Sequence, residues 1–249
     1  MPRALLSLVF ALVVLAGPRL QAAIGLLASS NANVSFSTVT GYLGNTSLST
    51  ALTITTNAYA AGQFGLASIW GATGPDQVFL FYFESNEVGY IISTGSGIGN
   101  ANYGCMTTTD PIPNGSATYR IMARATPLVA CEVFVNGVQQ TTTITFNPPG
   151  FDGLRNNAPL QIGHNTNLGF DGVDGDYAEF AQWVEFVPDW VAIAYGKGMS
   201  PMLYRQNGLF YMPLTNTSGL RDVWGGNLGT NTAGTDAVHP RMYYPESGQ

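Results

Sequence analysis

The stretch FDGVDGDY contains three aspartates that could bind a metal ion. Asp171, Asp174 and Asp176 put three carboxylates within six residues, and Ca²⁺ prefers six to eight such oxygen ligands. Their spacing of three and then two residues differs from the EF-hand loop, which also needs a distal Glu. Two interpretations stay open: a calcium site, or a tight turn in which the Asp side chains bond to the nearby backbone.

A second candidate site combines an aromatic ring with amides. Tyr103 follows Asn102 in the Gly- and Asn-rich stretch GIGNANYGC, and Tyr90 lies in the preceding apolar run. Rings with one apolar face and a polar edge suit recognition of partly polar ligands. Core burial is the default for each aromatic residue, and Tyr103 is the best candidate for an exposed ring that contacts a ligand, together with Asn102 and Tyr90. The default for Trp183 and Trp190 is burial in the core.

Other reactive groups are sparse. His164 and His239 have no partner in the sequence that indicates a Ser–His or Cys–His nucleophile pair. Cys105 and Cys131 have no zinc-ligand spacing. They could form a disulfide in an oxidising compartment or remain two buried thiols.

The composition limits the partners. Only 10% of the residues are charged, the net charge is −6 and the pI is near 4.7. Nucleic acid is an improbable partner, because its recognition needs a basic surface that displaces counterions from phosphates. No Lys/Arg cluster is available to hold the chain on an anionic membrane.

The N-terminus has the pattern of a secretory signal. A basic MPR precedes the apolar run ALLSLVFALVVLAG, and PRLQAA ends in small residues. The run is shorter than the roughly 20 residues that span a bilayer. We expect cleavage after residues 1–23, which removes Arg3 and Arg19 and leaves a net charge of −8. Stable membrane insertion is then not expected.

The sequence predicts that the candidate site residues lie on or between short strands. Runs rich in aromatic and β-branched residues alternate with Gly, Asn, Pro and Asp clusters, for example QVFLFYFES, ATYRIMARAT and ACEVFVNGVQQ. Asn136-Gly137 predicts a type I′ hairpin, because both central residues need positive φ. The segment VPDWVAIAYGKG predicts one short helix near residues 188–195, with Trp190, Ile193 and Ala194 on one apolar face. We expect an all-β antiparallel sandwich whose last strands pair with the first.

Four pieces resemble the concanavalin A-like lectin/glucanase superfamily, in particular its LamG/pentraxin-like jelly rolls. These pieces are SIWG, YRIMARATPLVACEVFVNGVQQ, LQIGH and FDGVDGDYAEFAQWVEFVPDWVAIAYGKG. The later stretches GMSPMLYRQNGLFYMPL, DVWGGNL and HPRMYYP are similar to a C-terminal extension of uncharacterised bacterial and phage proteins of this type. The resemblance implies a jelly-roll domain over residues 24–214 and an extended segment over 215–249 packed on it.

The resemblance also raises the question of glycoside hydrolysis. The glucanases of this superfamily share an E-x-D-x-x-E or E-x-D-x-E strand, which presents a pair of carboxylates to the cleft. Asp176, Glu179 and Glu185 are spaced by three and six residues, and Glu84 and Glu87 by three. A spacing of three places two residues on opposite faces of a strand, so an enzyme is not expected.

The sequence therefore predicts a non-catalytic, secreted or extracytoplasmic domain that binds a glycan or protein surface, with Ca²⁺ as a possible cofactor. Self-association into an oligomer is compatible with this function. The alternative is a structural or assembly protein of a virion, such as a phage decoration or tail component, with no small ligand.

Overall fold

A computed structural model gives the fold. It describes residues 22–26, 32–37, 39–57, 62–71, 77–94, 102–113, 115–147, 149–154, 159–165, 167, 171–238, 240 and 242–243. All but the last two residues of the predicted signal peptide 1–23 lie outside the described residues, as does His239.

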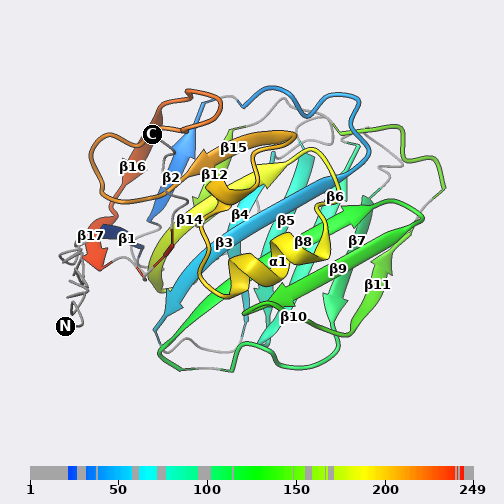
Figure 1. Ribbon diagram of the computed structural model, residues 1–249, viewed down its shortest axis with the longest axis horizontal. Coiled ribbons are helices and arrows are strands. Elements are labelled where there is room, and N and C mark those ends of the chain that lie inside the picture. Colours follow the sequence, from blue (N-terminus) through cyan, green and yellow to red (C-terminus); the bar gives the residue numbers. More distant parts are fainter. Residues whose placement is uncertain are drawn as a thin grey trace, which may run out of the picture.

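Two antiparallel sheets are stacked face to face (Figure 1). In sheet A the order is β10 (Val138–Gln139), β9 (Ala130–Val135), β8 (Ala117–Thr126), β3 (Leu48–Thr56), β14 (Gly175–Trp183), β1 (Ala22–Leu26) and β17 (Thr235–Val238), and β15 (Gly208–Met212) also pairs with β14. In sheet B the order is β11 (Thr142–Phe146), β7 (Asn102–Thr107), β6 (Glu87–Ser93), β5 (Gln77–Glu84), β4 (Gln63–Trp70), β12 (Leu160–Gly163), β2 (Asn33–Phe36) and β16 (Gly229–Thr232). The short β13 (Asp171–Gly172) joins sheet B parallel to β4. The predicted all-β sandwich is confirmed.

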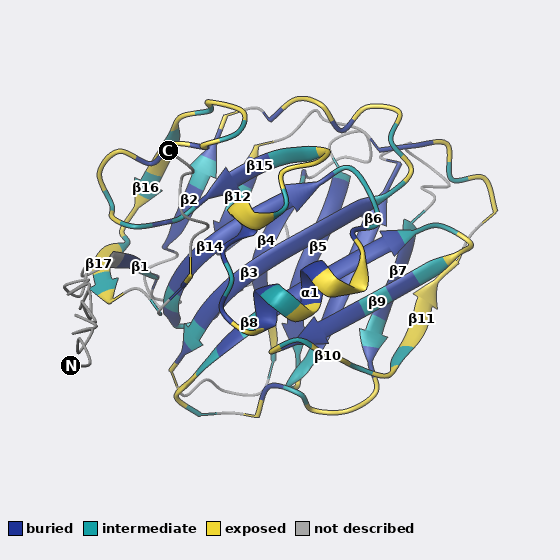
Figure 2. Ribbon diagram, viewed as in Figure 1, coloured by how far each residue is buried: buried dark blue, intermediate teal, exposed yellow. Residues whose placement is uncertain are grey.

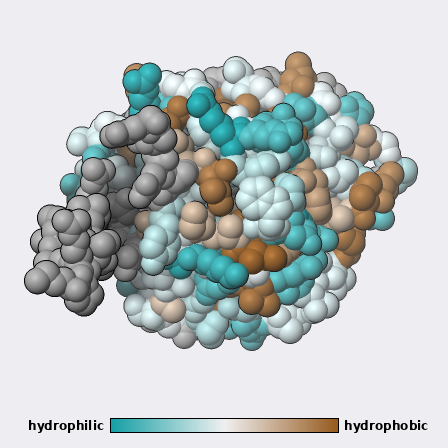
Figure 3. All heavy atoms as spheres, viewed as in Figure 1, coloured by the Kyte–Doolittle hydropathy of each residue, from teal (hydrophilic) through white to brown (hydrophobic). Residues whose placement is uncertain are grey.

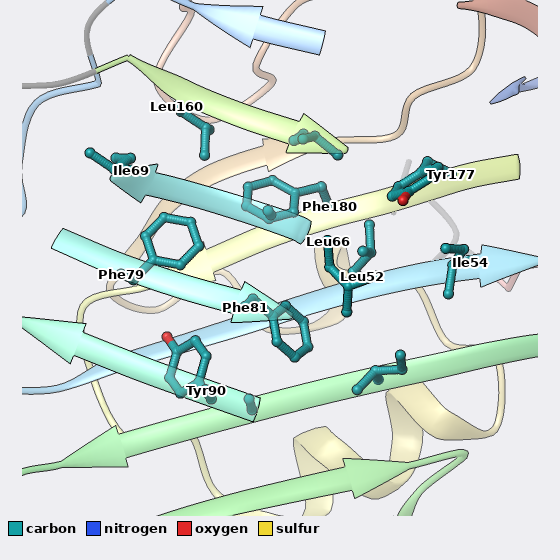
Figure 4. Packing of buried hydrophobic residues seen from close by; sticks show 14 of the residues in the cluster. Leu52, Ile54, Leu66, Ile69, Phe79, Phe81, Tyr90, Leu160, Tyr177 and Phe180 are labelled. Atoms are coloured by element: carbon teal, nitrogen blue, oxygen red, sulfur yellow. The ribbon is translucent and has the colours of Figure 1, made fainter. Parts of the chain in front are cut away.

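The core fills the space between the sheets. Alternate residues of each strand point inward, as the twofold period of a strand requires. Figure 4 shows Phe79, Phe81 and Tyr90 of sheet B facing Leu52 and Phe180 of sheet A. Burial of such rings supplies the main stabilisation of a sandwich.

Both ends of the described chain complete the sheets. β17 pairs with β1, and β16 pairs with β2, so the last strands do return to the first. The segment predicted as extended, residues 215–249, therefore contributes strands to both sheets. No helix among the described residues is long and apolar enough to cross a membrane.

The predicted hairpin and helix are present. Asn136 and Gly137 have φ values of 51° and 78° between β9 and β10, as the type I′ turn requires. The helix α1 (Asp189–Gly196) lies on the outer face of sheet A (Figure 1). Gly196 is its last residue.

The apolar face predicted for α1 is wrong. Val191, Ala192 and Tyr195 are the buried side chains, whereas Trp190 is 51% exposed and Ile193 37% exposed. Figure 2 shows exposed residues on the outer surface of α1. The Tyr195 hydroxyl bonds to Thr53 at 2.8 Å, so the contacts with sheet A decide which face of the helix is covered.

Arg124 joins α1 to sheet A. Its side chain, on β8, is 2% exposed and binds the carboxylates of Glu132 and Asp189. The guanidinium carbon also lies 4.8 Å from the ring centroid of Phe134 and 4.4 Å from that of Phe186. A buried guanidinium needs such compensation, because desolvation of an unpaired charge is costly.

Candidate ligand-binding groove at the sheet edges

An open groove lies between the start of β9 in sheet A and the edge strand β11 of sheet B. Its volume is about 670 Å³, which falls within the usual range for small-molecule sites. The chain passes from sheet A to sheet B at residues 139–142, and these residues form part of the lining. The groove is therefore built where the two layers of the sandwich separate.

One part of the groove carries amides and hydroxyls. Gln139, Gln140, Thr141, Thr142 and Asn147 all line it. The backbone N–H of Gln140 donates to the Val133 carbonyl at 2.8 Å, and the Thr142 hydroxyl donates to the Cys131 carbonyl at 3.0 Å. These bonds fix the crossing segment while Gln139 and Thr141 stay exposed. The lining can donate and accept hydrogen bonds.

The other part is apolar. Leu128 and Val129, in the turn between β8 and β9, are 66% and 78% exposed, and Ile144 of β11 is 41% exposed. Leu128 has a φ of 63°, a left-handed conformation that is uncommon for a residue other than Gly, Asn or Asp. Turn tips usually carry Gly or small polar residues, so this apolar tip has no evident role in the fold.

The groove is closed underneath by a disulfide and a tyrosine. Cys105 of β7 and Cys131 of β9 are bonded, so the bridge joins sheet B to sheet A directly beside the groove. Of the two alternatives open in the sequence, the structure has the disulfide. Tyr103 also lines the groove, and burial raises the pKa of its hydroxyl.

The residues predicted to contact a ligand are mostly buried. Tyr103 is 3% exposed, because Asn102 already begins strand β7 and Tyr103 points into the core. Tyr90 is fully buried, and its hydroxyl lies 2.9 Å from that of Thr50. Tyr103, the candidate for an exposed ring, is therefore buried, and Tyr90 has the burial that is the default for an aromatic residue. Asn102 is half-buried. Sequence reasoning missed the groove's amides, for which the only signal was the uncharged run VQQTTT.

The three aspartates do not converge. Asp171 belongs to β13 in sheet B, Asp174 to the following turn, and Asp176 to β14 in sheet A. Burial raises the pKa of Asp176, and Asp171 Oδ1 lies 3.9 Å from Nδ1 of the buried His164. Across the described part of the chain, no three His, Cys, Asp or Glu side chains form a group that could hold a metal ion. The calcium site and the turn therefore both stay predictions, and the three carboxylates lie on separate elements.

Three of the glutamates considered for catalysis have separate hydrogen-bond partners. Glu179 is fully buried and accepts a hydrogen bond from the Tyr211 hydroxyl at 2.8 Å. Glu185 accepts one from the Asn207 amide at 2.8 Å, and Glu84 accepts one from Gln63 at the same distance. Each carboxylate has a different local partner, so these contacts assemble no catalytic pair.

Known proteins resemble this chain in fold but not in sequence. No family model matches the chain, and no curated protein matches it in sequence. A proposed carbohydrate-binding protein from Bacteroides ovatus is similar with a TM-score of 0.63 and 14% identity, over 90% of this chain and 62% of that one. A SAP-like pentraxin from Limulus polyphemus gives 0.56 and 11%, over 88% and 95%. Tailspike protein 2 of the Escherichia coli O157:H7 bacteriophage CAB120 gives 0.53 and 15%, over 78% and 26%.

These three proteins share their fold with this chain. Their fold is consistent with the resemblance to lectin-like jelly rolls that the sequence shows. The chain spans less than two thirds of the Bacteroides protein and about a quarter of the tailspike. Identities this low carry no activity from one protein to another.

Proposed function

We propose that this protein is a non-catalytic, extracytoplasmic binding domain that recognises a glycan in the groove between β9 and β11. The observation that carries the proposal is the lining itself. Five amide or hydroxyl side chains lie around a space of about 670 Å³, and apolar side chains flank them. A sugar offers many hydroxyls and weakly polar C–H faces, and this mixture complements both.

Two further observations support the proposal. The disulfide is typical of oxidising, extracytoplasmic compartments, and it would hold the groove in one shape, which lowers the ordering cost of binding. The sandwich is also the fold of a protein proposed to bind carbohydrate.

A glycan array with purified protein tests the proposal. We expect a defined set of neutral glycans to bind, and Gln139→Ala with Asn147→Ala to weaken that binding about thirtyfold, because each of the two lost hydrogen bonds costs about 1 kcal/mol. Asn57→Ala, which removes an exposed amide elsewhere, is the matched control. EDTA is expected to have little effect, since the three aspartates do not converge.

The main alternative is a virion assembly protein with no small ligand, and the fold shared with the tailspike favours keeping it in view. An array with no signal above background, with and without Ca²⁺, would refute glycan binding. Detection of the protein in purified particles would then favour the virion.

A further inference from the structure

A second cluster of side chains suited to a ligand lies on the outer side of sheet A, around the first turn of α1. Trp190 is 51% exposed. Its ring meets the ring of Tyr204 edge to face, with centroids 5.5 Å apart and planes at 85°. Tyr204 directly follows the short 3₁₀ helix η3 (Pro201–Leu203). An exposed tryptophan braced by a second ring offers a fixed flat surface.

Polar groups adjoin this surface. Burial first, and then the neighbouring Glu185 carboxylate, raise the pKa of the Tyr204 hydroxyl to about 12. The Asn207 side-chain amide donates to Glu185 Oε2 at 2.8 Å. The aromatic pair therefore lies beside a hydroxyl, a carboxylate and an amide.

The main chain holds these groups in place. The indole N–H of the buried Trp183 donates to the Tyr204 carbonyl at 2.7 Å. The Ser49 hydroxyl donates to the Glu185 carbonyl at 2.6 Å. Both donors belong to strands of sheet A, β14 and β3, so the cluster is built on the rigid part of the fold. Binding there would need little ordering.

A single exposed hydrophobic residue needs no explanation. Around Trp190 the aromatic pair and the polar side chains occur together, and this combination suits a ligand that is partly apolar and partly polar. Figure 3 shows this face with small hydrophobic patches between hydrophilic ones rather than one continuous apolar area. Such a mixed surface is less suited to a lipid or a large apolar partner than to a small amphipathic ring.

We propose that Trp190, Tyr204, Glu185 and Asn207 form a second carbohydrate site, for a neutral pyranose ring. One C–H face of the sugar stacks on the exposed face of Trp190, and its hydroxyls bond to the carboxylate of Glu185 and the amide of Asn207. Acidic sugars are disfavoured, because Glu185 and the exposed Asp189 repel a carboxylate. This site uses no residue of the groove, so one chain could hold two glycans.

The test is a titration of neutral disaccharides (lactose, maltose and cellobiose) followed by tryptophan emission and by calorimetry. We expect one of them to change the emission, and Trp190→Ala to abolish that change and weaken binding at least tenfold. Trp190→Tyr should keep most of the affinity, and Asn207→Ala should lose severalfold. Ile193→Ala is the matched control, because this residue lies on the same exposed side of α1.

The outcomes separate the two sites. Unchanged affinity and emission response in Trp190→Ala, with its melting temperature preserved, would overturn the second site. Loss of all binding in the groove variant Gln139→Ala with Asn147→Ala would do the same. Disaccharide binding that survives in the groove variant and disappears in Trp190→Ala would support this site even if the groove binds nothing.

Discussion

Removal of the Cys105–Cys131 bridge should destabilise the protein by an amount that follows from the loop it closes. The two cysteines are 26 residues apart. The chain-entropy relation for a loop of this size gives about 3.5 kcal/mol at 25 °C. For a chain of about this length, that loss corresponds to a fall in melting temperature of roughly 7–14 °C.

The assay compares Cys105→Ala, Cys131→Ala and the double variant by urea unfolding and calorimetry. A bond is lost completely when either partner is removed, so all three variants should lose nearly the same free energy. Dithiothreitol should lower the stability of the native protein to a similar level and leave the double variant unchanged. Two independent buried thiols would instead give losses that add.

Alkylation of the unfolded protein provides the direct check. Without reductant, the native sequence should take up no iodoacetamide, and with reductant it should take up two equivalents. Two equivalents without reductant, together with additive losses in the three variants, would refute the bridge between the sheets. It would also remove the argument that the groove is held in one shape.

Three further predictions concern the packing around α1 and the sheet faces. Arg124→Ala should cost about 1.5–3 kcal/mol in urea unfolding, because it removes charge-assisted hydrogen bonds to Glu132 and Asp189 and leaves the Val187 carbonyl without its donor; a loss below about 1 kcal/mol would contradict the role assigned to Arg124. Gly196→Ala should destabilise by about 1–3 kcal/mol, since a Cβ there would lie 1.9 Å from the Gly137 nitrogen; stability equal to that of the native chain would show that the helix can shift. Burial, with smaller repulsion from nearby glutamates, raises the pKa of Tyr82 to about 12, so the unfolded chain loses this proton near pH 10 and the folded one near pH 12. Stability should therefore fall between pH 10 and 12, less steeply in Tyr82→Phe, and an equal slope in the two proteins would argue against the shift.

Much of the fold could be predicted from local chemistry. The I′ hairpin depends only on the positive φ that Asn136 and Gly137 tolerate. The run QVFLFYFE, apolar on both sides, became the central strand β5, with Phe79 and Phe81 in the main core and Leu80 and Tyr82 in a smaller cluster on the other face. Such features are encoded within a few residues, so the sequence is enough.

The candidate groove could not be predicted in this way. Its lining joins the turn after β8 to the chain segment that crosses from sheet A to sheet B, and no local pattern shows that these approach each other. Tyr103 shows the same limit. Its Gly- and Asn-rich surroundings favour a loop, but strand β7 begins one residue earlier and turns the ring inward. The disulfide partner across the sandwich completes the site and is equally non-local.

The exposure of Trp190 also depends on contacts outside its own helix. A helix of eight residues with apolar side chains at every position from 190 to 195 can bury more than one face, so periodicity does not choose between them. The choice is made by contacts outside the helix: the close approach of Gly196 to Gly137, and the Tyr195 hydroxyl that reaches Thr53. Both contacts turn the side of α1 that lies opposite Trp190 toward sheet A. Once they are satisfied, the indole of Trp190 is left facing solvent beside Tyr204, and its exposure follows from the packing of smaller neighbours. The tryptophan is thus free to bind a ligand at no cost to the core, which is why Trp190→Ala can test recognition without testing stability.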